Sequence, residues 1–187
     1  MAALALLSLG ALAQGRHEFN LMLGGYKSEF IEMEPNADIV RGDLFDIYET
    51  HYHVDSGPCF TLDYKFALNS VIKVGAQFNW GEVDGYTWYR MGTRKGEEFR
   101  MDMLSLLPQV KFCIIPNSRH FRPYAKLAAG VQYTMNTKGA VSTAPVKFAW
   151  EVVPIGAEWG GQVIYGTAEF CYGTIVKGAR IGIGYRF

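Results

Sequence analysis

Residues 177–187 read K-G-A-R-I-G-I-G-Y-R-F, and this stretch decides the fold class. Apolar residues alternate there with arginine and glycine, the apolar set being Ala179, Ile181, Ile183, Tyr185 and Phe187. A period of two is typical of a β-strand with one apolar and one polar face. A strand in a membrane barrel needs this pattern, because its outer face meets lipid and its inner face lines a polar lumen. We therefore predict that residues 177–187 form a lipid-facing barrel strand.

Further segments upstream alternate in the same way. They cover residues 16–27, 57–67, 71–83, 99–115, 121–135, 146–159 and 162–172. The connections between successive segments run long, short, long, short, long, short, short. This order is typical of an up-and-down barrel with longer outer loops and tight inner turns. The sequence thus predicts an all-β fold, an eight-stranded antiparallel up-and-down transmembrane β-barrel.

Two of these segments break strict alternation. In residues 99–115, Met101 and Met103 are odd, whereas Leu104 and Leu106 are even. We expect either a β-bulge near residues 103–104 or a position above the membrane for residues 99–103. In residues 146–159 the apolar parity changes at Pro154, and a bulge is expected there because proline cannot donate to the ladder.

Aromatic residues lie near the ends of the predicted strands, where amphipathic rings meet lipid headgroups. We expect two girdles, an outer one of Trp80, Tyr133, Trp150 and Tyr172 and an inner one of Tyr64, Phe66, Trp159, Tyr185 and Phe187.

The composition argues against several classes of function. Lys and Arg together number 18, as do Asp and Glu, so no basic excess indicates a nucleic-acid partner. No long apolar run follows residue 13, as a helical membrane protein would require. The chain also lacks the G-x-S-x-G and H-E-x-x-H motifs and a glycine-rich loop that opens a helix. We expect a protein that is not an enzyme and that has no cofactor.

The N-terminal residues 1–13 read M-A-A-L-A-L-L-S-L-G-A-L-A, an apolar run that ends in a small-x-small cleavage site. This pattern predicts a secretory signal peptide, and the run is too short to span a bilayer as a helix. No Lys or Arg precedes the apolar run, so we expect the true start to lie upstream. The predicted barrel domain then covers residues 16–187.

Charged residues fall on the predicted inner face of the strands. They are Glu18, Asp63, Lys65, Lys73, Lys111, Arg122, Lys126, Glu169, Arg180 and Arg186. An eight-stranded barrel is narrow and mostly filled by side chains, so these charges must pair. Glu169 and Arg180 lie on adjacent strands and are the best candidates for one ion pair. A selective ion path and a closed polar plug both fit this pattern, and we favour the plug.

The long predicted loops carry the remaining polar features. Residues 28–56 are acidic and contain His51 and His53, whose H-x-H spacing is a weak candidate for a metal site because no third ligand is fixed. Residues 84–98 mix arginine and lysine with aromatic residues, which suits a phosphate-rich lipid surface or a partner protein. Three cysteines, Cys59, Cys113 and Cys171, share the inward parity, and their odd number implies no disulfide framework.

Three motifs carry a resemblance to a known family: P-I-G-A-E-W-G at residues 154–160, A-E-F-C-Y-G at 168–173 and the terminal R-I-G-I-G-Y-R-F. With its architecture, the chain resembles the small eight-stranded bacterial outer-membrane barrels, such as the OmpA transmembrane domain, OmpX and porin-like barrel domains. The resemblance implies a place in the outer membrane and contact with its lipid. It implies that the last strand, with Tyr185 and Phe187, is read by the barrel-insertion machinery. It also implies a structural or adhesive role, with loops 28–56 and 84–98 offered to a host or surface ligand.

Three alternatives stay open at the level of the sequence. A narrow porin-like channel would use the charged lumen as an ion path. A PagP-like lipid acyltransferase would need His51, Asp55 and Ser56 to converge at the outer rim. A soluble lipocalin-like barrel would invert the two faces, with an apolar lumen that holds a ligand and a polar exterior.

Overall fold

The computed structural model describes residues 16–25, 50–89, 95–116, 118, 120–138 and 145–187. For residues 50–56, 85–89, 95–99 and 136–138 it describes the backbone alone. The predicted signal peptide, residues 1–13, lies outside this part of the chain. Among the described residues, no helix has the length and apolar character needed to cross a membrane.

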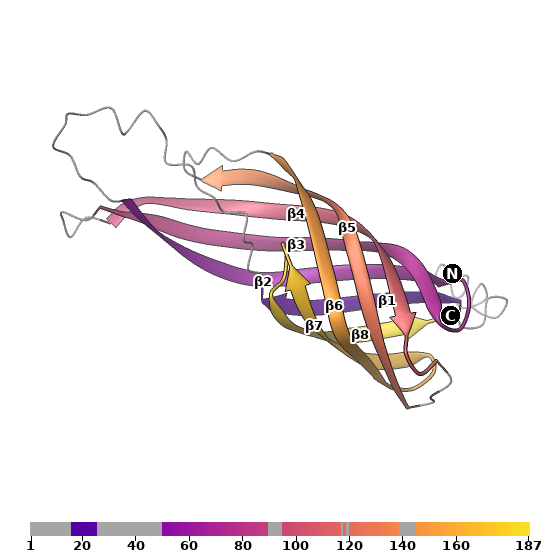
Figure 1. Cartoon of the computed structure of the whole chain (residues 1–187). Helices are drawn as coiled ribbons and strands as arrows, with labels where there is room; N and C mark the ends of the chain where they lie inside the picture. The colour runs from indigo at the N-terminus through magenta and orange to yellow at the C-terminus, as the bar shows by residue number, and fades with distance from the viewer. Residues whose placement is uncertain (1–15, 26–49, 90–94, 117, 119, 139–144) are drawn as a thin grey trace, which may run out of the picture.

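The predicted eight-stranded antiparallel barrel is confirmed (Figure 1). The strands are β1 (His17–Gly25), β2 (Thr50–Ala67), β3 (Ile72–Tyr89), β4 (Lys95–Cys113), β5 (Phe121–Lys138), β6 (Val146–Gly160), β7 (Ile164–Gly173) and β8 (Gly178–Arg186). Each strand pairs with its neighbours in the chain, and β8 pairs with β1 to close the barrel. The backbone amide of His17 donates to Phe187 at 2.9 Å, so the two ends of the described barrel meet at one rim.

The apolar residues of the alternating pattern point outward, as the sequence predicts. Ile181 and Ile183 of β8 expose 63% and 64% of their surface, whereas Arg180 of the same strand exposes 1%. In β3 the outward apolar positions run from Ile72 to Trp80, about 26 Å of strand at about 3.3 Å per residue. This is the length that a membrane-spanning strand needs. The exterior of the barrel is therefore an apolar belt of membrane height.

The strands differ greatly in length, so the wall of the barrel is taller on one side (Figure 1). The strands β2, β3, β4 and β5 have 18 or 19 residues, whereas β1 and β8 have 9. Above Trp80 the outward face of the tall side becomes polar, and Arg100 contacts Glu82 at 2.6 Å there. The tall side thus continues beyond the apolar belt as a paired sheet.

This extension corrects the predicted loops. Residues 50–56 belong to β2 and pair with β3, although the sequence analysis assigns them to the first loop. Residues 84–89 and 95–98 likewise belong to β3 and β4, so the connection between these strands shrinks to residues 90–94. The alternation of apolar and polar residues ends where the outer face leaves the lipid, but the backbone pairing does not.

The predicted bulge near residues 103–104 of β4 is wrong. Pairing with β3 runs without a break from Phe112 to Glu98, and Met101 and Met103 point into the barrel with 1% and 4% exposure. A register shift occurs instead between Arg100 and Met101, on the side facing β5. The two methionines keep the inward parity because the interior at their level is apolar.

The predicted bulge at Pro154 of β6 is confirmed. Val153 faces inward and Gly156 faces inward, while Pro154 and Ile155 between them both face outward. The register against β5 and the register against β7 both shift at this point. The bulge therefore reverses which parity of β6 faces the interior.

Outward aromatic side chains gather near the two ends of the belt, in line with the predicted girdles. At the rim near the chain ends, Phe187 stacks on His17 at 5.3 Å and on Tyr185 at 5.7 Å between ring centroids. At the other end, Trp150 packs against Tyr172 at 5.9 Å, and Trp80 stacks on Phe60 at 5.6 Å.

Candidate functional site: the charged interior

The interior of the barrel has three levels along its axis. A lower cluster of charges lies near the rim where β1 begins and β8 ends, and it consists of Glu18, Glu158, Lys73, Lys111, Arg122 and Arg186. A central cluster consists of Asp63, Glu151, Glu169, Lys65, Lys126 and Arg180. An apolar region includes Val83, Met101, Met103, Leu107, Ala149, Val153, Ile175 and Val176.

Arg180 of β8 holds the central cluster together. Its Nε donates to Glu169 at 2.6 Å, and its two Nη atoms donate to Glu151 at 2.5 and 3.1 Å. A planar guanidinium can serve two carboxylates at once because its donors form a fixed fork. All three side chains are buried, so the pairing compensates for taking these charges out of water.

Lys126 of β5 is the second cation of the central cluster. Its Nζ lies 3.0 Å from Glu169 and 3.7 Å from Glu151. It also donates to Gln77 at 3.0 Å. Lys65 pairs with Asp63, and Gln109 donates to Asp63 as well. Three carboxylates and three cations thus balance one another at this level.

Neutral polar groups extend the central cluster to the surrounding strands. Tyr124 donates to Glu169 at 2.7 Å and contacts the hydroxyl of Thr167 at 2.9 Å. Thr61 donates to Asn79 at 2.7 Å, and Asn79 donates to Ser105 at 2.8 Å. These bonds connect β2, β3, β4, β5 and β7 across the interior, so the cluster cross-links the barrel.

In the lower cluster several cations share two carboxylates. Glu18 accepts from Lys73 and from Arg186, and Lys111 lies 3.5 Å from its other oxygen. Glu158 accepts from Lys111, from Arg122 at 2.9 Å and from Arg186 at 2.9 Å. The side chains come from β1, β3, β4, β5, β6 and β8, so this cluster also spans the interior.

Two buried tyrosine rings lie against cations of the lower cluster. Lys111 lies 4.0 Å from the ring centre of Tyr124. Arg186 and Arg122 lie 4.7 and 5.4 Å from the ring centre of Tyr165. The negative face of an aromatic ring attracts a cation, which partly offsets repulsion among these like charges.

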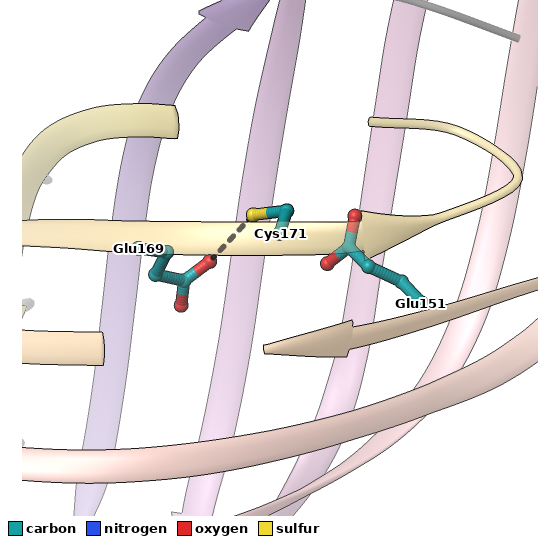
Figure 2. Close-up of side chains that lie close together, drawn as sticks. All are labelled: Glu151, Glu169 and Cys171. Atoms are coloured by element: carbon teal, nitrogen blue, oxygen red, sulfur yellow. Dashed lines mark hydrogen bonds between the residues drawn. The ribbon is translucent and has the colours of Figure 1, made fainter. Parts of the chain in front are cut away.

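One buried group has the composition of a metal site. Glu151, Glu169 and Cys171 bring their ligand atoms within 4.8 Å of one another, and Figure 2 shows them on β6 and β7. The thiol of Cys171 contacts Glu169 at 3.9 Å. The guanidinium of Arg180, however, already bonds to both carboxylates, and a metal ion would have to displace it. We assign no metal to this group.

The interior contains every charged residue that the sequence analysis places there. Glu169, Arg180, Lys126 and Asp63 join the central cluster, and Lys73 and Arg186 join the lower one. Glu169 and Arg180 stand opposite each other in the register of β7 and β8. The side chains of His51 and His53 lie outside the described part, as do those of Asp55 and Ser56. Tyr185 faces outward at the rim, and the ring of Phe187 stacks on it there.

Two carboxylates of these clusters could not be recognised from strict alternation. Glu151 and Glu158 both lie on β6 and both face inward, with 1% exposure each. They are seven positions apart, so without a bulge one of them would face outward. The predicted bulge at Pro154 was the signal that could have placed both in the interior.

The solved structures that are similar to this chain include two outer-membrane proteins. The outer membrane protein OprG from Pseudomonas aeruginosa matches with a TM-score of 0.66 at 10% identity, over 94% of this chain and 97% of that one. The N-terminal β-barrel domain of OprF from Pseudomonas aeruginosa matches with a TM-score of 0.51 at 11% identity, over 93% of this chain and 100% of that one. This chain has the fold of the small outer-membrane β-barrels. No family model and no curated protein matches its sequence.

An outer-membrane barrel fold of eight strands has an interior that is just wide enough for side chains to fill. The two clusters occupy that interior with side chains from strands that do not pair with each other, such as Lys111 of β4 and Glu158 of β6. Lys126 of β5 and Glu169 of β7 meet in the same way. The arrangement can hold the walls of the barrel together, because its charged side chains pair between strands that are not neighbours.

Proposed function

We propose that this protein is an integral β-barrel of the bacterial outer membrane with a structural, adhesive or surface-interaction role. The apolar belt carries the proposal, because large apolar side chains such as Leu62, Leu127 and Phe170 expose half or more of their surface around the barrel. A water-soluble protein rarely exposes a contiguous apolar surface of this size. Lipid is the solvent that suits such a belt, and a closed barrel leaves no unpaired strand edge in it.

We further propose that the interior is a closed polar plug rather than an ion path. Arg180 bonds to carboxylates from β6 and β7, and Lys111 of β4 bonds to Glu158 of β6, a strand with which β4 is not paired. Buried pairs of this kind are costly to separate, because each partner would be left as an unpaired charge. This supports a non-enzymatic barrel, and it makes the narrow porin-like channel the less favoured alternative.

We assign the surface-interaction role to the part of the chain that extends beyond the apolar belt. The paired sheet of β2, β3 and β4 supports it, because it presents polar residues such as Glu82, Asp84 and Arg100 beyond the belt. Residues 28–56 and 84–98 are the segments that we propose for contact with a host or surface ligand.

Two segments of the chain would direct its export and its insertion into the outer membrane. Residues 1–13 serve as the signal peptide, and the last strand serves as the signal for the insertion machinery. The outward position of Tyr185 and Phe187 on a strand of the closing seam supports this role, because these rings remain accessible until β8 pairs with β1.

The other two alternatives find less support. A soluble lipocalin-like barrel needs a polar exterior, whereas this exterior is apolar from Ile72 to Trp80 along β3. A PagP-like acyltransferase needs His51, Asp55 and Ser56 to converge, and their side chains lie outside the described part.

Fractionation of cells that express the full chain tests the proposal. We expect the protein in the outer-membrane fraction, with a mobility on a detergent gel that changes when the sample is boiled. The matched variant Leu62→Arg, which places a charge in the belt, should reduce the folded band, whereas Leu62→Ile should not. Recovery as a soluble periplasmic protein without a heat-dependent mobility would overturn the membrane assignment.

A further inference from the structure

The connection between β7 and β8, residues 174–177, folds into the barrel instead of extending beyond it. Thr174, Ile175 and Val176 expose 3%, 0% and 0% of their surface. Connections between strands normally run over the surface of a protein, because a buried connection has backbone groups that need partners. An isoleucine and a valine without exposure indicate that this connection is part of the barrel interior.

Hydrogen bonds and two glycines hold the connection in this position. The amide of Thr174 donates to the carbonyl of Trp150 at 2.9 Å, and the amide of Trp150 donates to the hydroxyl of Thr174 at 3.0 Å. A Cβ atom at Gly173 would clash with the same carbonyl oxygen, so glycine permits this close approach to β6. Gly178, where β8 begins, has a φ of 123°, in the left-handed region that favours glycine. The chain can therefore turn inward after Gly173 and turn back at Gly178.

Ile175 and Val176 pack in the apolar region of the interior, next to the central cluster. They belong to one group of buried side chains with Cys59 of β2 and Cys171 of β7. The thiol of Cys171 in turn contacts Glu169 of the central cluster at 3.9 Å. Since β7 begins at the rim where β8 ends, the connection lies on the side of the central cluster away from that rim.

We propose that residues 174–177 are an apolar cap that keeps water-soluble molecules from entering the central cluster at this end. Ile175 and Val176 exclude water, and the ion pairs beside them are stronger where water is absent. The inference goes beyond the proposed polar plug. Thr174, Ile175 and Val176 carry no charge, so they close this end of the interior without an ion pair of their own.

The access of a water-soluble reagent to two buried thiols tests the cap. Cys59 and Cys171 are each 1% exposed, and Cys113, at the far end of β4, is replaced by serine so that only these two can react. The folded full chain in uncharged micelles is treated with a charged maleimide, and labelling is followed by intact mass. Labelling should be far slower than in protein unfolded by boiling. The double variant Ile175→Ser/Val176→Ser should label at least about tenfold faster, because the loss of apolar burial favours local opening.

Two control variants distinguish the cap from a general loosening of the barrel. Ile175→Val keeps an apolar side chain in the cap and should label as slowly as the chain with the intact cap. Tyr165→Leu removes a buried ring and its hydrogen bond to Asn20 at 2.7 Å, near the rim of the chain ends. It should not accelerate labelling, because the central cluster lies between this rim and the two thiols.

Three results would overturn the cap. They are rapid labelling of the chain with the intact cap, an unchanged rate in the double variant, and an equal acceleration by Tyr165→Leu. If the double variant fails to fold, as judged by its mobility on an unboiled gel, Val176→Ser alone decides the question. None of these results would alter the outer-membrane assignment, which fractionation tests separately.

Discussion

Replacement of Arg180 by methionine should cause the largest loss of stability in the barrel interior. The change keeps most of the side-chain volume but leaves Glu151 and Glu169 without the guanidinium that bonds to both. Three charge-assisted hydrogen bonds disappear, each worth about 1.5–3 kcal/mol. Lys126 remains 3.0 Å from Glu169 and offsets part of the loss, so we expect a decrease in the free energy of unfolding of about 3–5 kcal/mol.

Urea unfolding of the barrel refolded into lipid vesicles measures this change, with the unboiled gel band as the readout of folded protein. The variant Glu169→Gln should cost about 1–3 kcal/mol on its own. The double variant should cost less than the sum of the two, because Arg180 and Glu169 interact directly. A double-mutant cycle should give a coupling energy of at least about 1 kcal/mol.

The matched control is Arg100→Met, which breaks a contact with Glu82 on the exposed part of the tall wall. Its effect should stay below about 1 kcal/mol, because the Arg100 side chain is 49% exposed and water screens the pair. If Arg180→Met costs no more than this control, or if the effects of Arg180→Met and Glu169→Gln simply add, the reasoning about a cross-linking cluster is wrong.

Three further predictions concern other parts of the barrel. Gly75→Ala should prevent folding into vesicles, since the added Cβ would clash with the backbone carbonyl oxygen of Tyr64, whereas Gly25→Ala meets open space and should fold normally. Ile183→Arg should lower the free energy of unfolding in vesicles by about 2–4 kcal/mol. A decrease of less than about 0.5 kcal/mol would contradict a lipid-facing position for Ile183. Phe187→Ala should slow assembly in cells, measured by pulse-labelling, while unfolding in vesicles changes little; equal assembly rates would remove the insertion-signal role.

The fold could be predicted because the lipid imposes one simple pattern. Every outward position between Ile72 and Trp80 must be apolar, so apolar and polar residues alternate regularly along this part of the sequence. Pro154 could be recognised as a bulge because proline lacks the amide that the ladder requires. The alternation and the proline can both be recognised from short stretches of sequence, so neither requires knowledge of contacts between distant residues.

The interior could be predicted only where partners lie on paired strands. Glu169 and Arg180 could be paired from the sequence because β7 and β8 are adjacent, whereas Lys111 and Glu158 come from β4 and β6, which do not pair with each other. The orientation of Met101 and Met103 could not be predicted, because they face the apolar region of the interior and alternation alone cannot distinguish an apolar lumen from lipid. The predicted lengths of β2 and β3 were too short, because the apolar alternation ends at the edge of the belt while the strands continue.

The unequal strand lengths mean that the barrel is closed only over part of its height. Beyond Pro58, which pairs with Gly25, β2 continues to Thr50 with β3 as its single described partner. On the other flank, β5 continues past Thr134 with β4 as its described partner. Half of the amides along these two margins have no strand of the described residues opposite them, so amide hydrogen exchange should divide there into alternating fast and slow positions. Over the closed height, by contrast, neighbouring amides should exchange at similarly slow rates.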